Sequence, residues 1–363
     1  MKQTDTISPR QFVATAFVCV LSPLIRRFPR TLVLSAGRIA WLTVPAAVPA
    51  AALILWLFWL LFHKRPGESF SAILSDVLGG FSGKVLTALY ALWLLFYTGF
   101  LLRSGAIRFL STVYQGARPW IFVAGIAAVC ALAAAGTVRA VARTAMLLRP
   151  LLAAIPALAV VLTFKDADFR MLMPVILEDP ASDAMAVLKL VNLLGIVLFL
   201  SFLGDRIGAP LRVRDWAGWT GVILALVGLM TVGCLGMFGP ELTARMTYPF
   251  FMLVRDVTVL GSFERVEPVI IAVWIFADFI LLSLLPRIAA GNLRYCVSAG
   301  TDDPPRWLPP LCTFLAALVA FVLPEDLTVF YLLSERIVPL TSAALCFGIP
   351  LLTLIVGKLR KRL

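Results

Sequence analysis

Apolar runs of about 20 residues recur along the whole chain, and charged residues gather at their ends. A run of that length spans the hydrocarbon core of a bilayer as one helix. Of the 363 residues, 61% are hydrophobic and only 14% are charged, unlike the composition of a soluble domain. No polar stretch is long enough for a separate soluble domain. We therefore expect residues 1–363 to form one all-α domain integral to the membrane.

The runs predict ten membrane-spanning helices. They lie at approximately residues 10–33, 39–62, 85–113, 119–136, 144–163, 186–206, 216–238, 267–289, 307–323 and 337–358. Ten spans place both termini on one side of the membrane, and the larger share of Lys and Arg on that side favours cytoplasmic termini. The basic end of the chain, KLRKRL, is then expected to anchor it to anionic headgroups at the cytoplasmic surface.

Two of the predicted spans are interrupted by residues that disturb a helix. Ser22-Pro23 and Phe28-Pro29 interrupt the first span, and Gly204 followed by Asp205-Arg206 interrupts the sixth. Lipid cannot hydrogen-bond the backbone groups freed at a break, so each break must be buried in protein or line a wet cavity. Two broken helices at corresponding places in two halves of a chain indicate a binding site for a small solute.

The positions of the breaks also predict the internal organisation of the domain. Five spans separate one break from the next, which is the layout of a five-plus-five inverted repeat. The first repeat would cover residues 10–163. The second would begin at residue 186 and end at residue 323, or at residue 358 when the last span is counted.

Ionisable residues inside the spans are candidates for function, because they are costly at membrane depth. Asp278 lies near the middle of the eighth span, so we expect it to face a cavity, to be protonated or to pair with a cation. Arg103 is a candidate partner; the alternative is that Arg103 and Arg108 reach the outer interface. Tyr97 could line the same cavity, or pack with its hydroxyl on a neighbouring carbonyl.

The second break offers both charge and backbone freedom. Asp205 and Arg206 either lie at membrane depth or extend to water from the cytoplasmic end of the helix. Gly204 is the stronger functional candidate, because glycine allows a backbone to unwind or to approach another group closely.

Catalytic and metal chemistry have little support in the sequence. The single histidine, His63, and six isolated cysteines supply neither a His-based triad nor a zinc or disulfide framework. The segment 79–84 resembles a phosphate loop, but its glycine spacing is one residue short and Val85 replaces the required Ser or Thr. The net charge of +12 lies at span ends, which suits a lipid bilayer and not nucleic acid. We expect no enzyme, no cofactor and no metal site.

Several short motifs, taken in order, resemble those of one membrane protein family. They are ISPRQ at 7–11, Phe28-Pro29-Arg30, Trp41, GGFSGK at 79–84, Arg103, SFLG at 201–204, GPE at 239–241, Tyr248-Pro249, GSFERVE at 261–267 and Trp274. The order and spacing of these motifs make the chain similar, over essentially its whole length, to the B subunits of spore germinant receptors, the GerAB-like spore permease family.

The resemblance implies an amino acid–polyamine–organocation transporter-like fold, with ten helices in a LeuT-like five-plus-five inverted repeat and helices 1 and 6 broken. It also implies a multi-pass protein of the spore inner membrane that works with A- and C-type receptor subunits. Such a subunit binds a small nutrient germinant, commonly an amino acid, and triggers germination. The alternative function is an amino acid permease that moves its solute by alternating access.

The resemblance also implies a ligand pocket. Carried over by position, the pocket falls on Ser22, Leu24, Tyr97, Leu203, Leu281 and Leu285. Gly204 and Asp278 complete the set of expected ligand-binding residues. Leu281 and Leu285 stand where relatives can offer polar groups, which favours an apolar part of the ligand at that face.

Overall fold

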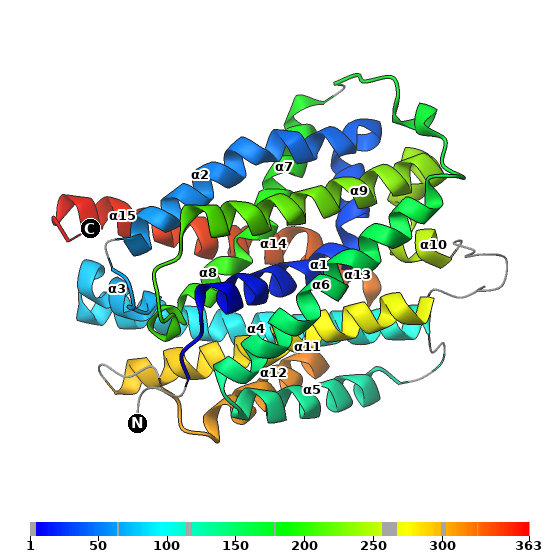
Figure 1. The fold of residues 1–363 in the computed structure, drawn as a ribbon. Coiled ribbons are helices and arrows are strands. Elements are labelled where there is room, and N and C mark those ends of the chain that lie inside the picture. The colour runs from blue at the N-terminus through cyan, green and yellow to red at the C-terminus, as the bar shows by residue number, and fades with distance from the viewer. Residues whose placement is uncertain are drawn as a thin grey trace.

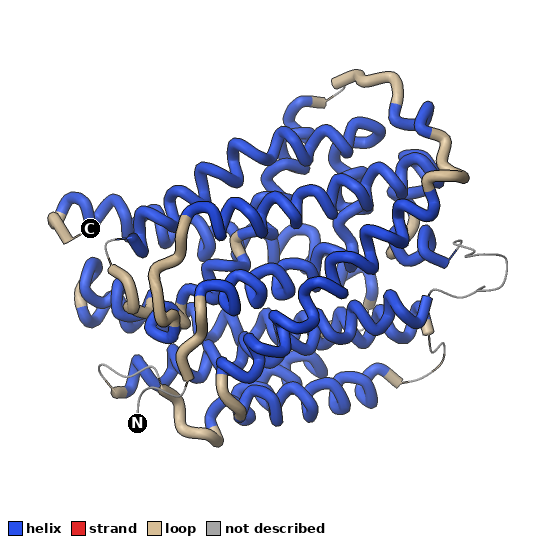
Figure 2. Tube along the Cα trace, viewed as in Figure 1, coloured by secondary structure: helices blue, strands red, loops and turns tan. Residues whose placement is uncertain are grey.

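The computed structural model of the chain describes residues 5–63, 65–113, 116, 118–177, 179–255, 267–298, 303–324 and 326–362. In this part of the chain every regular element is a helix, and one isolated β-bridge joins Ile7 to Ile207 (Figure 2). The first half comprises α1 (Pro9–Ala36), the 3-10 helix η1 (Gly37–Leu42), α2 (Thr43–His63), α3 (Phe70–Leu78), α4 (Gly80–Thr112), α5 (Pro119–Ala135), α6 (Val138–Thr163) and η2 (Phe169–Leu172).

The second half is built from a similar series of helices. They are α7 (Pro180–Leu194), α8 (Ile196–Ser201), η3 (Gly204–Arg206), α9 (Val213–Arg245), α10 (Pro249–Arg255), α11 (Glu267–Val297), α12 (Leu308–Val322), α13 (Leu327–Leu332), η4 (Leu333–Ile337), α14 (Val338–Ala343), η5 (Ala344–Gly348) and α15 (Ile349–Leu359). The all-α prediction is confirmed for the described residues.

The long helices lie side by side in one bundle, with α1 inside it (Figure 1). α1 packs against α6, α7, α9 and α11, which is why 20 of its 28 residues are buried. Within the described ranges, seven helical stretches are long and apolar enough to cross a membrane, the first of them the 55 residues Pro9–His63. The shorter helices α5 and α12 are also apolar. The start of α1 and the end of α15 lie toward the same end of the bundle, here called the terminal end (Figure 1).

The first predicted break is wrong, because α1 is one continuous helix through Pro23 and Pro29. A proline removes one backbone hydrogen bond and frees the carbonyl four residues earlier, at Cys19 or Ile25. Both of those residues are buried among neighbouring helices. Packing against neighbouring helices therefore stabilises α1 despite the backbone hydrogen bonds lost at its prolines, a loss that would break an isolated helix.

The sixth span is interrupted as predicted, but at a different residue. α7 ends at Leu194, Gly195 forms a turn, and α8 begins at Ile196. A Cβ atom on Gly195 would lie 2.8 Å from Cβ of Cys346, so glycine is needed for the close approach of the last span. Gly204 lies beyond the end of α8, in the turn η3. The prediction was placed at Gly204 because a charged pair follows it, whereas Gly195 has apolar residues on both sides.

A separate element follows α9, which is kinked at Gly239 with φ of 70°. The sequence between spans seven and eight has hydrophobic residues at near-helical spacing, which predicts a helix lying on the membrane surface. α10 is instead packed inside the protein against α1 and α9, with Phe250, Phe251 and Val254 buried. The prediction failed because an apolar helix face can be covered by protein as well as by lipid. The motif residues 261–266 lie outside the described residues.

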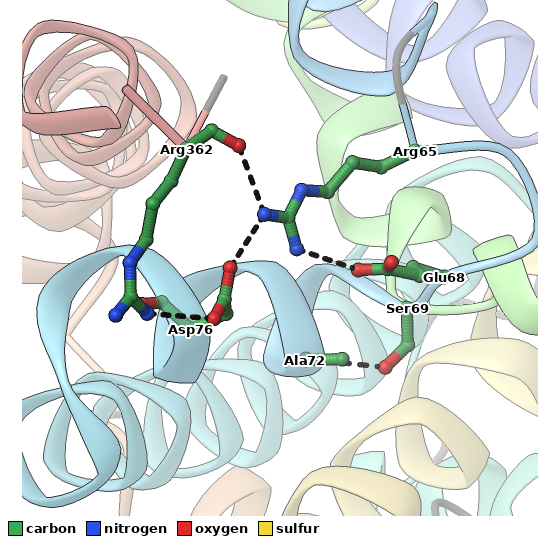
Figure 3. A network of polar contacts seen from close by, with 6 residues as sticks. All are labelled: Arg65, Glu68, Ser69, Ala72, Asp76 and Arg362. Atoms are coloured by element: carbon green, nitrogen blue, oxygen red, sulfur yellow. Dashed lines mark hydrogen bonds and ion pairs between the residues drawn. The ribbon is translucent and has the colours of Figure 1, made fainter. Parts of the chain in front are cut away.

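The basic C-terminal segment binds a helix end. Figure 3 shows Arg362 donating to the Asp76 carboxylate, with 2.7 Å between Nη1 and Oδ1, while Arg65 contacts Asp76, Glu68 and the Arg362 carbonyl. Arg360 donates to the carbonyl of Val77 at 2.8 Å. The Val77 carbonyl belongs to the last turn of α3. The carbonyls of a last helical turn lack helical donors and attract cations. Arg360 and Arg362 thus bind the end of α3 while remaining exposed, and the expected contact of this segment with headgroups stays a prediction.

Replacing Asp76 with alanine is expected to lower the stability of the protein by about 1 kcal/mol, because Asp76 receives two arginines at a partly exposed site. Thermal unfolding of the purified protein in detergent measures this. Glu68→Ala is the matched control, since it removes a single ion pair to Arg65 from a similarly exposed carboxylate. An Asp76→Ala protein with an unchanged Tm, or one more stable than Glu68→Ala, would contradict the account.

Candidate functional site

Asp278 joins three helices in the interior of the bundle. Its carboxylate, on α11, accepts hydrogen bonds from the Ser22 hydroxyl of α1 and from the Arg108 guanidinium of α4. Arg108 is only 1% exposed, and its guanidinium lies 4.8 Å from the ring centre of Trp274. The expectation that Asp278 pairs with a cation is met by an ion pair removed from water.

Helical spacing places these side chains next to one another. Trp274 and Asp278 are four residues apart on α11, so one face of that helix presents both to Arg108. A Cβ atom on Gly105 would lie 3.8 Å from Oδ2 of Asp278, so the α4 backbone passes beside the carboxylate. Ser22 and Arg26 are likewise four residues apart on α1.

The identity of the partner differs from the prediction. The sequence suggested Arg103 as the partner of Asp278, and the structure assigns this role to Arg108. Both arginines are buried, so neither reaches the outer interface by the alternative route. Five residues separate them on α4, and only the rotation of α4 against α11 decides which one faces Asp278.

A cavity of about 130 Å³ lies beside this cluster, between α1, α4, α7, α8 and the helical stretch Thr328–Leu359, here called the last helical stretch. Its lining combines apolar residues with several polar and charged side chains. The polar lining residues include Arg26, Arg27, Tyr97, Ser104, Lys189, Asn192, Ser334, Glu335 and Ser342. Arg26 connects the cavity to the cluster, because its Nη1 donates to Ser104 Oγ at 3.0 Å and its charge interacts with Asp278.

Irregular helix geometry surrounds the cavity. Asn192 and Ile196 line it on either side of the Gly195 interruption. The π-helical turns η4 and η5 contribute Glu335 and Cys346 from the opposite side. Single π-helical turns inside α-helices are frequent at functional sites, because they redirect side chains and free backbone groups. Backbone irregularity at membrane depth is tolerated here because the groups are enclosed in protein.

Polar side chains satisfy some of the backbone groups at these turns. The Tyr90 hydroxyl donates to the Leu345 carbonyl at 2.6 Å, and Asn192 Nδ2 donates to the Pro339 carbonyl at 2.9 Å. Both interactions hold the last stretch against α4 and α7. Side-chain hydrogen bonds from α4 and α7 thus hold irregular segments of the cavity wall in place.

The eight residues expected at the ligand site fall in different places. Ser22 and Asp278 contact each other, and Tyr97 lines the cavity. Leu24, Leu281 and Leu285 are fully buried in the core. Leu203 and Gly204 lie at the terminal end, where Gly204 packs against the backbone of Glu68 and borders a separate cavity of about 270 Å³.

Sequence reasoning missed Arg26, Arg27, Lys189, Asn192 and Glu335, which line the cavity. A signal for Arg26 and Arg27 was present, because two adjacent cations stand inside the first apolar run immediately after Ser22-Pro23. Lys189 and Asn192 are similar polar exceptions in the sixth run. Glu335 precedes the last predicted span, and no pattern in the sequence connects it with α1.

Asp205 and Arg206 belong to an ionic network at the terminal end. Arg206 lies 3.0 Å from Asp303, 3.1 Å from Asp205 and 3.6 Å from Asp5. Arg287 joins the network through Asp5 at 3.1 Å. Burial raises the pKa of the Asp205 carboxyl above its ordinary value. Of the two alternatives, the helix-end position is correct, but the charges bind one another instead of extending freely to water.

Comparison with known proteins gives a family and a fold. A family model described as a spore germination protein matches residues 6–325. No curated protein matches this chain significantly. Among solved structures, the chain is similar to Mhp1, a nucleobase-cation-symport-1 family transporter, in a closed conformation with bromovinylhydantoin bound. The identity is 14% and the TM-score 0.64, over 95% of this chain and 80% of that chain.

Two further structures show the same likeness in fold. The inward-facing conformation of Mhp1 has 14% identity and a TM-score of 0.56, over 94% of this chain and 75% of that chain. A Na⁺-coupled sialic acid symporter in a substrate-bound, outward-open state has 12% identity and a TM-score of 0.55, over 95% of this chain and 80% of that chain.

Proposed function

This chain belongs to the spore germination protein family, and from that premise we propose that it is the membrane subunit of a spore nutrient-germinant receptor. In this role it binds a small, amino acid-like germinant and triggers germination together with A- and C-type subunits. It resides in the inner membrane of the spore, with its termini in the cytoplasm. The family match and the many apolar helices support this proposal.

We further propose a ten-span, five-plus-five inverted repeat. The stretch Pro9–His63 has 55 residues, which at about 1.5 Å per residue is long enough to cross a bilayer core of about 30 Å twice. Counting it as two spans, and α5 and α12 as short spans, gives ten. The likeness in fold to Mhp1 supports this arrangement. In it, α1 and the α7–α8 pair are the corresponding first helices of the two repeats.

The germinant is proposed to bind in the cavity between α1, α4, α7 and α8. The observation that carries this proposal is the convergence of polar side chains, an interrupted helix and two π-helical turns on one cavity. Tyr97 lies on its wall, and Ser22 and Asp278 hold α1 against α11 beside it. A ligand bound there touches both α1 and the last helical stretch, so it can shift the balance between two arrangements of these helices.

Filling the cavity tests this proposal. Ser342 is buried and lines the cavity, so Ser342→Phe is expected to abolish the germination response of spores to L-amino acids. Ala344→Phe is the matched control, because Ala344 is two residues away and exposed. Both variants must be present in the spore membrane at the wild-type level, measured by immunoblot. A normal response of Ser342→Phe spores at that level would contradict the proposed site.

An amino acid permease is the second candidate function, and the likeness in fold to two transporters favours it. Uptake of labelled L-amino acids into proteoliposomes that contain this chain alone separates the two candidates. Concentrative uptake would support the permease. Ligand binding without uptake would support the receptor subunit.

A further inference from the structure

The cavity between α1, α4, α7 and α8 has a surplus of positive charge. Among the described residues that line it, Arg26, Arg27 and Lys189 are cations and Glu335 is the single carboxylate. Arg26 and Arg27 are only 5% and 9% exposed. Charges buried in a membrane protein interior are normally paired, because an unpaired buried charge is strongly unfavourable.

The nearby carboxylates are already engaged. Glu335 serves two of the cations, with 3.0 Å between its Oε1 and Arg27 Nη2 and 3.8 Å between its Oε2 and Lys189 Nζ. Asp278 is bound by Ser22 and Arg108. Within the described residues, the neutral Ser104 hydroxyl is the hydrogen-bond acceptor of Arg26. Among the described residues of the cavity and the Asp278 cluster together, four cations face two carboxylates.

Two side chains that line the cavity carry a polar atom without a hydrogen-bond partner among the described residues. Nε of Arg27 is buried without an acceptor, while Nη1 of the same guanidinium donates to Ser334 at 2.6 Å. Oδ1 of Asn192, on the α7 wall, is buried without a donor. The cavity is thus lined by a guanidinium on α1 and an amide on α7 whose hydrogen-bonding capacity the described residues do not fully use. Buried groups of this kind are almost always satisfied, by protein, water or a ligand.

We propose that this cavity binds a small carboxylate that carries net negative charge, with its carboxylate on Arg26 and Arg27 and a donor group on Asn192. The charge of the ligand would offset the surplus that the protein leaves uncompensated. Charge-assisted bonds between guanidinium and carboxylate are directional and strong. The cavity volume of about 130 Å³ restricts the ligand to a few carbon atoms. This inference rests on the proposed function and specifies the chemical class of its ligand.

Binding of matched probes to the full chain tests the inference. The purified protein in nanodiscs, in chloride-free buffer, is titrated with L-aspartate, its near-isosteric amide L-asparagine, succinate and L-alanine, and binding is followed by calorimetry. We expect L-aspartate or succinate to bind at least about 10-fold more tightly than L-asparagine, the effect of one charged hydrogen bond. Equal affinities, or a preference for the neutral amino acids, would overturn the inference.

A variant of Arg27, compared with a control arginine outside the cavity, separates the recognition of ligand charge from an effect on folding. Arg27→Gln is expected to weaken binding of the preferred anion about 10-fold or more, and to change L-asparagine binding less. Arg30→Gln is the matched control, because Arg30 lies on the same helix but donates to the Ala244 carbonyl and does not line the cavity. Lys189→Gln gives a second test at a less buried position. Equal losses for the anion and the amide would overturn the charge assignment.

Failure of the inference can be told apart from failure of the proposed function. Binding of L-alanine but not of L-aspartate or succinate overturns the anionic ligand and leaves the receptor subunit intact. Absence of binding by all four probes also overturns the inference. The receptor function is then decided separately, by the response of Ser342→Phe spores.

Discussion

Asp278→Asn is expected to lower the stability of the protein by about 3–5 kcal/mol and to abolish the germination response. The carboxylate of Asp278 is the ion-pair partner of Arg108, which is 1% exposed. Asparagine has nearly the same shape but no charge, so it leaves a guanidinium buried without compensation. The contact from Ser22 also weakens, and α1 then loses an interaction that holds it against α11.

Thermal unfolding in detergent and the spore response measure the two parts of this prediction. Asp303→Asn is the matched control, because Asp303 also pairs with an arginine at 3.0 Å but is 69% exposed, so its loss is expected to cost less than about 1 kcal/mol. The double variant Asp278→Leu with Arg108→Met removes both charges and should recover part of the lost stability. If Asp278→Asn unfolded at the wild-type temperature, the ion pair would not have the role assigned to it.

The sequence predicts the helices well because the bilayer constrains them. An apolar run long enough to cross the hydrocarbon core has no alternative to a helix, so the span at 119–136 reappears as Pro119–Ala135 and that at 307–323 as Leu308–Val322. The helix breaks are harder to predict. Pro23 looks like a break and is not one, because α1 is packed on all sides, whereas Gly195 has no flanking charge and does interrupt the helix.

The candidate site was only partly predictable for a similar reason. Asp278 and Tyr97 stand out because polar groups are rare in apolar runs, and both lie at or beside the cavity. Their partners depend on how neighbouring helices are rotated. α4 buries residues on several of its faces, so its hydrophobic pattern does not indicate whether Arg103 or Arg108 faces α11. Glu335 reaches the cavity through a π-helical turn, which no periodicity in the sequence reveals.

Gly204 was expected to contact the ligand, and its surroundings assign it to close packing. A Cβ atom at Gly204 would lie 2.2 Å from the backbone oxygen of Glu68, a distance that no side chain can occupy. Neither partner is free to move. Phe202 holds the turn by packing against Phe70, with 5.3 Å between ring centres, and Ser69 caps the first turn of α3. A methyl group at residue 204 must therefore displace one backbone segment from the other.

We accordingly expect Gly204→Ala to lower the stability by about 3 kcal/mol, at the upper end of the usual cost of overpacking, since the clash is with backbone. Gly208→Ala is the matched control, because its new Cβ would meet only the Ile7 carbonyl at 3.8 Å, an ordinary contact. Thermal unfolding of both purified variants measures the difference. Spores carrying Gly204→Ala should then lose germination in proportion to the subunit lost from the membrane. A Gly204→Ala protein with wild-type Tm and normal abundance, but without a germinant response, would instead return Gly204 to the ligand site.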